Sequence, residues 1–203
     1  MEYRPYTIKN YHMIPQLKFL RQTAICDMDV VGRVLPFKTN NYVVDELIDW
    51  DNFDNDPLFT INFPQKKLMD RKDFDLISGL LKSGAGSSVI NQAVDGVRLG
   101  LNPHPAGQLE CNIPELDGSK LSGIQHKYSE TMIVFPAQGQ TCHSYCTFCF
   151  RWPQFTGMSD YKMALKQAKV SAEYLKRHPE ITDVLFSGGD PMVMNASRLE
   201  IYI

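Results

Sequence analysis

Hydrophobic residues recur at helical spacing through the middle of the N-terminal half of the chain. The segments 67–81 and 87–97 place apolar side chains three or four positions apart, and a turn from Gly84 to Gly86 separates them. The alternation of polar and apolar residues that predicts a strand is not seen before residue 125. The pattern therefore predicts a mainly helical N-terminal region.

The last third of the chain has a different pattern. Two short apolar runs, 132–135 and 184–186, flank the segment 159–177, in which apolar residues return every three or four positions. Ser159 is a suitable N-cap for this helix, and Pro179 prevents its continuation. Strand, helix and strand predict one right-handed βαβ unit with parallel strands. The loops after the two strands should then lie side by side, where such sheets bind ligands.

A stretch rich in proline, glycine and asparagine, 102–123, lies between these two patterns. Such a composition is typical of a long surface connection or strap. We place a domain boundary near its end. This gives a helical N-terminal region and strap at 1–125 and an α/β domain at 126–203.

Composition and charge narrow the class of protein. The 203 residues are 43% hydrophobic and 22% charged, as in a soluble globular protein. The 21 basic and 23 acidic residues are spread along the chain, which argues against nucleic acid and membrane surfaces as partners. No apolar run approaches the roughly 20 residues that span a bilayer, and the start of the chain is too polar for a signal peptide. We expect a cytoplasmic protein.

Three of the five cysteines are clustered, with the spacing Cys142-x3-Cys146-x2-Cys149. An odd number of cysteines without an export signal argues against a disulfide framework. Three thiolates leave one iron of a four-iron cluster open for a small molecule, whereas a structural zinc site or a ferredoxin cluster takes four protein ligands. The isolated Cys26 and Cys111 are expected to be small buried side chains without a role.

Two other readings of the cysteine triplet stay open. Positions i, i+4 and i+7 share one face of a helix, so the cysteines could be core residues. His143 could instead be the fourth ligand of a zinc site, although a residue adjacent to Cys142 is awkwardly placed to reach the same ion. The polar, turn-like surroundings favour the iron–sulfur interpretation.

A second loop, Ser187-Gly188-Gly189-Asp190-Pro191, follows the second apolar run. Its glycines permit tight turns and positive φ, so that main-chain polar groups can approach a ligand. By itself, a Gly-Gly pair after a strand predicts only a turn. Its place beside the cysteine loop, across one βαβ unit, favours a role in ligand binding.

Together, the two loops resemble those of the lysine 2,3-aminomutase family of radical S-adenosylmethionine enzymes. The matching loop residues are Cys142, Cys146, Phe148, Cys149 and 187–191. Similar upstream segments are 37–50, Asp56-Pro57, Phe63-Pro64-Gln65 and, entering the first barrel strand, His126-Lys127-Tyr128. The resemblance implies an α/β fold in which 126–203 contains the first βαβ unit of a radical SAM partial TIM barrel.

The resemblance also implies a chemistry. Cys142, Cys146 and Cys149 would bind a 4Fe-4S cluster, whose open iron holds S-adenosylmethionine. An electron from the cluster would cleave this cofactor to methionine and a 5'-deoxyadenosyl radical, which abstracts hydrogen from the substrate. The full-length protein would be an amino-acid 2,3-aminomutase-like isomerase that also uses pyridoxal phosphate.

Further residues receive roles only from this resemblance. Phe148 would lie against the adenosyl group, and Gly188, Gly189 and Asp190 would receive the methionine amino group. Arg151 would be the catalytic-site arginine that faces the substrate carboxylate, a role that suits a guanidinium fork. The plainer alternatives are a core aromatic for Phe148, a solvated turn carboxylate for Asp190, and for Arg151 a surface position or a pair with Asp160.

The sequence also departs from the family's pattern. Trp152-Pro153-Gln154 follow Arg151 where the family has further arginines, and Thr131 stands in place of another arginine. The identity of the amino-acid substrate is therefore left open. A six- or eight-unit barrel needs many more residues than follow the cysteine loop. We expect the chain to be the N-terminal portion of a longer enzyme, inactive alone, with the pyridoxal-phosphate lysine outside it.

The expected partners are a small amino-acid substrate and a reducing electron donor, and a homo-oligomer is compatible with the sequence. Two other functions compete with the isomerase. One is a non-catalytic iron–sulfur binding module that acts through partners. The other is a radical SAM enzyme of different chemistry without pyridoxal phosphate.

Overall fold

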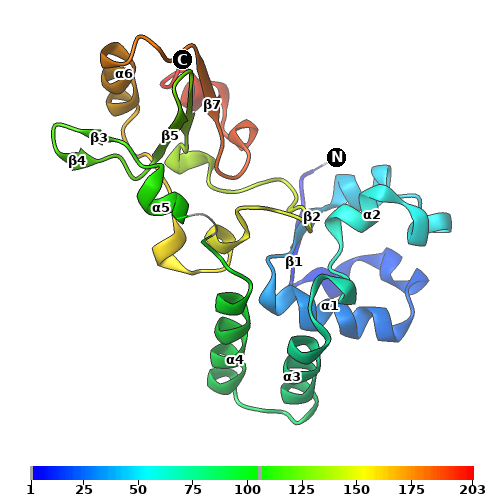
Figure 1. Ribbon diagram of the computed structural model, residues 1–203. Coiled ribbons are helices and arrows are strands. Elements are labelled where there is room, and N and C mark those ends of the chain that lie inside the picture. The colour runs from blue at the N-terminus through cyan, green and yellow to red at the C-terminus, as the bar shows by residue number, and fades with distance from the viewer. Residues whose placement is uncertain (1, 105–106) are drawn as a thin grey trace. The chain divides into compact units, whose positions relative to one another are not determined.

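The computed structural model describes residues 2–104 and 107–203, except for the side chain of Ser159. The described residues fall into two compact units (Figure 1). The first comprises Met1–Pro103 and His143–Trp152, and the second comprises His104–Cys142 and Pro153–Ile203. Residues 104 and 107–125, which by sequence we place with the N-terminal region, therefore lie in the second unit.

Helices dominate the first unit, as the hydrophobic pattern predicts. Helices α1 (Gln22–Val34), α3 (Arg71–Lys82) and α4 (Ser87–Gly100) share an apolar core. Along α4, the buried residues Ile90, Val94 and Val97 recur at the spacing of one helix face. The predicted helices at 67–81 and 87–97 are thus confirmed, but the first is split, because a separate 3-10 turn precedes α3.

A second core of the first unit is aromatic. Helix α2 (Pro57–Asn62) stacks Phe59 on Phe63, with ring centroids 4.8 Å apart, and Trp50 packs edge-on against both rings. Asp56 begins this helix, because its Oδ1 accepts a hydrogen bond from the N–H of Phe59 at 2.7 Å. The aromatic core therefore fixes the position of α2.

Short elements connect these helices. Strands β1 (Pro5–Thr7) and β2 (Lys38–Asn40) pair antiparallel, with Tyr6 opposite Thr39. Strands of this length are too short to show an alternating pattern in the sequence, and we did not predict them. The remaining turns are η1 (Tyr11–Met13), η2 (Pro15–Phe19), η3 (Val43–Leu47), η4 (Trp50–Asn55) and η5 (Lys66–Leu68).

A mixed sheet forms the centre of the second unit, which makes the chain mixed α/β. Strand β6 (Thr131–Val134) pairs parallel with β7 (Asp183–Phe186), and helix α6 (Ala168–Arg177) connects them. The predicted parallel strand-helix-strand unit is confirmed. Strand β5 (Ile124–Tyr128), which the sequence pattern does not predict, pairs antiparallel with β6.

The apolar face of α6 packs on this sheet. Met132 and Val134 of β6 are fully buried in a core with Tyr174 of the helix. The helix begins at Ala168, so the prediction of a start at Ser159 is wrong. The reason is that Leu165 pairs in an extended conformation, donating to the carbonyl of Phe135 at 2.6 Å. Met163 and Leu165 are therefore buried without forming part of the helix.

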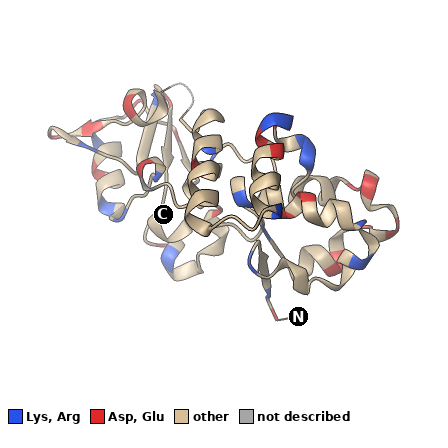
Figure 2. Cartoon of the chain, turned by 90° about the horizontal axis from the view of Figure 1, so that it is seen from below, with Lys and Arg blue, Asp and Glu red and all other residues tan. Residues whose placement is uncertain are grey.

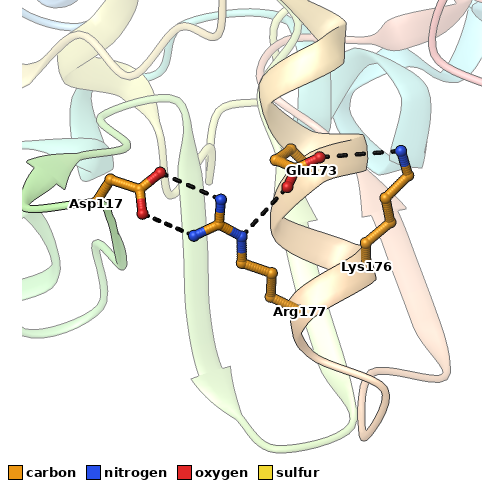
Figure 3. A network of polar contacts seen from close by, with 4 residues as sticks. All are labelled: Asp117, Glu173, Lys176 and Arg177. Carbon is orange, nitrogen blue, oxygen red and sulfur yellow. Dashed lines mark hydrogen bonds and ion pairs between the residues drawn. The ribbon is translucent and has the colours of Figure 1, made fainter.

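The connection at 102–123 is more than a surface strap. Strands β3 (Glu115–Leu116) and β4 (Ser119–Lys120) form a hairpin whose turn residues, Asp117 and Gly118, have φ values of 51° and 76°. Arg177, at the end of α6, binds the Asp117 carboxylate and holds the hairpin (Figure 3).

The other elements of the second unit and of the cysteine loop's end are short. They are α5 (Gln108–Cys111), η7 (Ala137–Gly139), η8 (Trp152–Phe155), η9 (Ser159–Tyr161), η10 (Pro191–Val193) and α7 (Ala196–Leu199).

Positions of basic and acidic residues are interspersed along the elements of the chain (Figure 2). This agrees with the even spread of basic and acidic residues in the sequence. Within residues 2–104 and 107–203, every helix is too short or too polar to cross a membrane.

Candidate functional site

The cysteine loop, residues 141–151, connects the two units. The boundary lies between Cys142 and His143, so Cys142 belongs to the second unit, whereas Cys146 and Cys149 belong to the first. Among the residues that the structure describes, no three His, Cys, Asp or Glu side chains are gathered as a ready-made metal site. Cys146 and Cys149 therefore lie in one unit, and Cys142, at the start of the loop, lies in the other.

One side of the loop is tied to strand β2. The main-chain N–H of Tyr145 donates to the carbonyl of Lys38 at 2.8 Å. The Ser144 hydroxyl donates to Oγ1 of Thr39 at 3.2 Å, and Thr39 is fully buried. Because β2 is part of the first unit, these bonds fasten the spacer between Cys142 and Cys146 to that unit.

The carbonyl of His143 is held by side chains from the same region. Asn40, at the end of β2, donates from Nδ2 to this carbonyl at 3.1 Å, and its Oδ1 accepts from the N–H of Val43 at 3.1 Å. The Tyr3 hydroxyl reaches the same carbonyl at 3.3 Å. Asn40 is 4% exposed, so its amide group is buried with both ends bonded.

The other side of the loop is tied to the end of α2. The N–H of Thr147 donates to the carbonyl of Ile61 at 2.7 Å, and the Thr147 hydroxyl donates to the carbonyl of Thr60 at 3.1 Å. Carbonyls in the last turn of a helix have no partner within the helix. Thr147 supplies hydrogen-bond donors to two of these carbonyls. Helix α2 therefore supports the loop, and the loop in turn satisfies the end of α2.

Between these two attachments the chain turns tightly. The N–H of Cys149 donates to the carbonyl of Cys146 at 3.0 Å, and both residues line a small cavity of about 30 Å³ with Trp152. That volume is about what one water molecule needs. The other walls are mostly apolar, formed by Leu35, Pro36, Pro64 and Leu68, with Asn62 and Thr147 as their polar members. This side of the turn is therefore partly shielded from water.

Desolvation changes the ionisation of two groups in the turn. It raises the pKa of the Cys149 thiol, against an opposing hydrogen bond from the Arg151 main chain. It also lowers the pKa of the Arg151 side chain to about 10, which leaves the guanidinium charged at neutral pH. Metal ligands must be thiolates, so metal binding at Cys149 has to release a proton. The nearby positive charge of Arg151 favours that release.

The exposure of the cysteines settles two expectations. Residues 142–149 form turns and not a helix, and Cys146 is exposed, so the alternative of three core cysteines on one helix face is wrong. Cys142 and Cys149 are half-buried. The expectation that Cys26 and Cys111 are buried is also wrong, because both are exposed. Cys26 lies outside the buried face of α1.

The glycine loop after β7 contacts the start of the cysteine loop. The N–H of Gly189 donates to the carbonyl of Gly139 at 3.2 Å, and that of Asp190 donates to the carbonyl of Thr141 at 2.7 Å. A Cβ at Gly189 would overlap the main chain of Thr141, and Gly188 has a φ of 137°. The prediction that the loops after the two parallel strands lie side by side is confirmed. Close approach of the two chain segments is what requires glycine here.

Asp190 has a local role in this loop. Its Oδ1 accepts a hydrogen bond from the N–H of Met192 at 2.9 Å and caps the turn η10. The side chain is half-buried. The alternative of a turn carboxylate is therefore supported, and contact with a ligand stays a prediction.

The exposure of Phe148 and Arg151 bears on their plainer alternatives, and for Arg151 a pair with Asp160 stays open. Phe148 is 73% exposed, so it is not a core aromatic. Arg151 is half-buried next to Cys149, so it is not a free surface arginine. An aromatic ring in solvent beside two cysteines is a candidate contact for a bound ligand.

Sequence reasoning missed the residues that hold the loop. Thr39 and Asn40 are buried polar side chains in a short segment between the buried Phe37 and Val43. Buried polar groups need hydrogen-bond partners, so this pattern was a usable signal that something binds there. The pattern does not reveal which distant segment supplies the partners.

No family model matches this chain. The sequence is 28% identical over 195 residues to a protein of Aquifex aeolicus provisionally named L-lysine 2,3-aminomutase, which is 95% of this chain and 41% of that protein. The L-lysine 2,3-aminomutase of Acetoanaerobium sticklandii is 32% identical over 108 residues, 53% of this chain and 25% of that enzyme. The chain is therefore similar to lysine 2,3-aminomutases over nearly its whole length.

The match confirms the resemblance seen in the motifs and extends it along nearly the whole of this chain. The L-lysine 2,3-aminomutase of Clostridium subterminale is 31% identical over 98 residues, 48% of this chain and 23% of that enzyme. The chain spans less than half the length of these curated relatives. Activity, substrates and partners of the whole protein are therefore matters for a proposal.

Proposed function

We propose that this chain carries the cluster-binding and S-adenosylmethionine-binding segment of a radical SAM isomerase that acts on an amino acid. The main support is the pair of loops after the parallel strands β6 and β7, which contain the cysteine triplet and the glycine pair and are hydrogen-bonded to each other. The lysine 2,3-aminomutase-like sequence around them agrees with this function. We interpret 126–203 as the first βαβ unit of a partial TIM barrel.

The donor set of the cysteine loop fits an iron–sulfur cluster. Cys142, Cys146 and Cys149 would hold three irons and leave the fourth open for the amino and carboxylate groups of S-adenosylmethionine. Bound there, a 4Fe-4S cluster supplies the electron that splits this cofactor into methionine and a 5'-deoxyadenosyl radical. The apolar wall beside Cys146 and Cys149 would limit water near the cluster, which influences its reduction potential.

The glycine loop fits a small polar ligand. Gly188 and Gly189 let the loop pack closely against Gln140 and Thr141 at the start of the cysteine loop, and Asp190 carries a carboxylate that is half-buried. We assign these residues to the methionine amino group. Phe148, with its ring in solvent, is assigned to the adenosyl group.

Arg151 is assigned to the carboxylate of the amino-acid substrate. Its guanidinium stays charged at neutral pH, and a planar fork binds carboxylates in a fixed geometry.

The function also requires a reducing electron donor and fits a cytoplasmic setting. Pyridoxal phosphate is proposed only from the family resemblance, and we assign none of the described residues to it.

Anaerobic reconstitution with iron and sulfide tests the cluster assignment. We expect about one four-iron cluster per chain, measured as iron and sulfide content and by electron paramagnetic resonance after reduction. Replacing Cys142, Cys146 or Cys149 with Ala should abolish the cluster, and replacing Cys26 or Cys111 should not. Stoichiometric, tightly held zinc in the protein isolated anaerobically, with no cluster after reconstitution, would refute the assignment.

A second assay tests the chemistry beyond the cluster. The reduced, reconstituted protein is incubated with S-adenosylmethionine, lysine and pyridoxal phosphate, and 5'-deoxyadenosine and β-amino acid are measured separately. Formation of 5'-deoxyadenosine supports the cofactor site. A stable cluster without this product would favour a non-catalytic iron–sulfur module. Formation of β-amino acid that does not need pyridoxal phosphate would favour radical chemistry of another kind.

A further inference from the structure

The spacer residues of the cysteine motif attach the loop to the first unit. His143, Ser144 and Tyr145 fill the x3 spacer, and each makes a hydrogen bond with β2. Thr147, in the x2 spacer, makes two hydrogen bonds with the end of α2. All of these bonds use main-chain groups, hydroxyls or an amide. They therefore shape the loop without involving the thiols.

Asn40 makes the most constrained of these attachments. Its Nδ2 donates to the carbonyl of His143, and its Oδ1 accepts from the N–H of Val43, so both ends of the buried amide are bonded. Rotation of the amide would break both hydrogen bonds at once. The Tyr3 hydroxyl reaches the same carbonyl over a longer distance and from an exposed side chain. Asn40 thus fixes the peptide that follows His143.

We infer that Asn40 is a positioning residue for the iron–sulfur ligands, holding the peptide between Cys142 and Cys146 in the shape that cluster binding needs. This inference rests on the cluster site proposed above. A loop shaped in advance loses less conformational freedom when its ligands bind. Residues that orient metal ligands typically change metal affinity or activity by about 10–100-fold when they are replaced.

Asn41 provides a matched control. It is also a buried asparagine, 8% exposed, whose Nδ2 donates to the carbonyl of Glu2 at 3.0 Å and whose Oδ1 accepts from the N–H of Arg4 at 2.7 Å. Replacing either asparagine with Asp removes one donated hydrogen bond and keeps the accepted one. Of these two asparagines, only Asn40 donates to the cysteine loop, so the pair separates positioning from general stability.

The experiment compares Asn40→Asp with Asn41→Asp after anaerobic reconstitution. We expect Asn40→Asp to lose iron to a chelator about 10-fold faster than the unchanged protein. Its reduced cluster should also give an altered electron paramagnetic resonance signal when S-adenosylmethionine is added. Asn41→Asp should match the unchanged protein in both measurements. Equal behaviour of the two variants would overturn the inference.

Hydrogen exchange in the iron-free protein gives a second readout. Asn40→Asp should speed exchange in residues 143–147, and Asn41→Asp should not. If Asn40→Asp does not fold, Thr147→Val should lose iron faster, and Thr147→Ser, which keeps the hydroxyl, should restore the slow rate. An unchanged protein that takes up no cluster would refute the proposed function. A cluster that is indifferent to Asn40 and Thr147 would refute only the positioning role.

Discussion

Arg177 holds the carboxylate of Asp117 with two hydrogen bonds, of 2.7 and 3.2 Å, that join residues 60 positions apart (Figure 3). Glu173, one turn earlier on α6, accepts a hydrogen bond from Nε of Arg177 at 3.2 Å and so orients the guanidinium. Two parallel bonds between arginine and carboxylate define a geometry as well as an attraction. The pair therefore sets where the hairpin of β3 and β4 lies on α6.

Replacing Asp117 with Asn should release this hairpin and leave the sheet folded. Hydrogen bonds and charge from Arg177 lower the pKa of Asp117. The pair therefore stabilises the hairpin above the unfolded pKa, about 3.9, and this stabilisation is lost as the pH falls through the lower folded pKa. At pH 7, hydrogen exchange in residues 115–120 should be faster in the variant.

The control for this prediction is Lys176→Gln. It removes the exposed pair between Lys176 and Glu173, at 3.9 Å, and leaves the bonds of Asp117 in place. We expect hairpin exchange to be unchanged in this variant. Similar exchange in both variants at pH 7 would show that the Asp117 pair does not hold the hairpin.

Gly189→Ala should destabilise the contact between the glycine loop and the cysteine loop. The new Cβ would overlap the main chain of Thr141, and a comparable forced shift costs about 1–3 kcal/mol. Gly96→Ala is the opposite case, because Gly96 lies within α4 with open space around its Cβ position. That change should stabilise the protein by about 0.5–1 kcal/mol. Urea unfolding measures both, and a stabilising Gly189→Ala would contradict the structure.

Phe63→Ala should lower the free energy of unfolding by about 3–5 kcal/mol. The ring is fully buried and stacks on Phe59, which fixes α2 under the cysteine loop. Leu99→Ala is the control, because this side chain is 59% exposed. Its removal should change the free energy of unfolding by less than about 0.5 kcal/mol. Comparable losses in urea unfolding would show that the aromatic core is not the main support of this unit.

Arg98→Lys should loosen the end of α1. Nε and Nη2 of Arg98 donate to the carbonyls of Val34 and Arg33 at 2.8 Å each, closing the last turn of the helix. A lysine has one ammonium group and cannot reproduce this fork, so we expect a loss of about 1–3 kcal/mol. Arg71→Lys, at a side chain that is 92% exposed, should leave the melting temperature unchanged. Equal melting temperatures for the two variants would contradict this role of Arg98.

The parts of the fold that the sequence predicts are those that depend on local pattern. The buried face of α4 and the parallel pairing of β6 with β7 follow from apolar spacing and from the order of the elements. The start of α6 could not be predicted in this way. Leu165 is extended, forms a β-bridge with Pro136 and donates to the carbonyl of Phe135, and such tertiary interactions override helical periodicity.

The candidate site likewise has some parts that the sequence predicts and others that it does not. The cysteine spacing and the glycine pair are recognisable from residue types, but the supports of the loop are not. Asn40 lies 103 residues from His143, and Thr60 lies 87 residues from Thr147. In the sequence, segment 37–50 stands out only through the family resemblance. Its contact with the cysteine loop gives a physical reason why these residues matter.

The attachment of the cysteine loop to β2 and α2 also has a consequence for synthesis. Residues 38–61 leave the ribosome well before residues 143–147, and chains generally fold in that order. Pairing across such separations is slow when both partners are unfolded. In a nascent chain, one partner is already folded when the other emerges. Cys146 and Cys149 can therefore be held in their turn before β7 has left the ribosome.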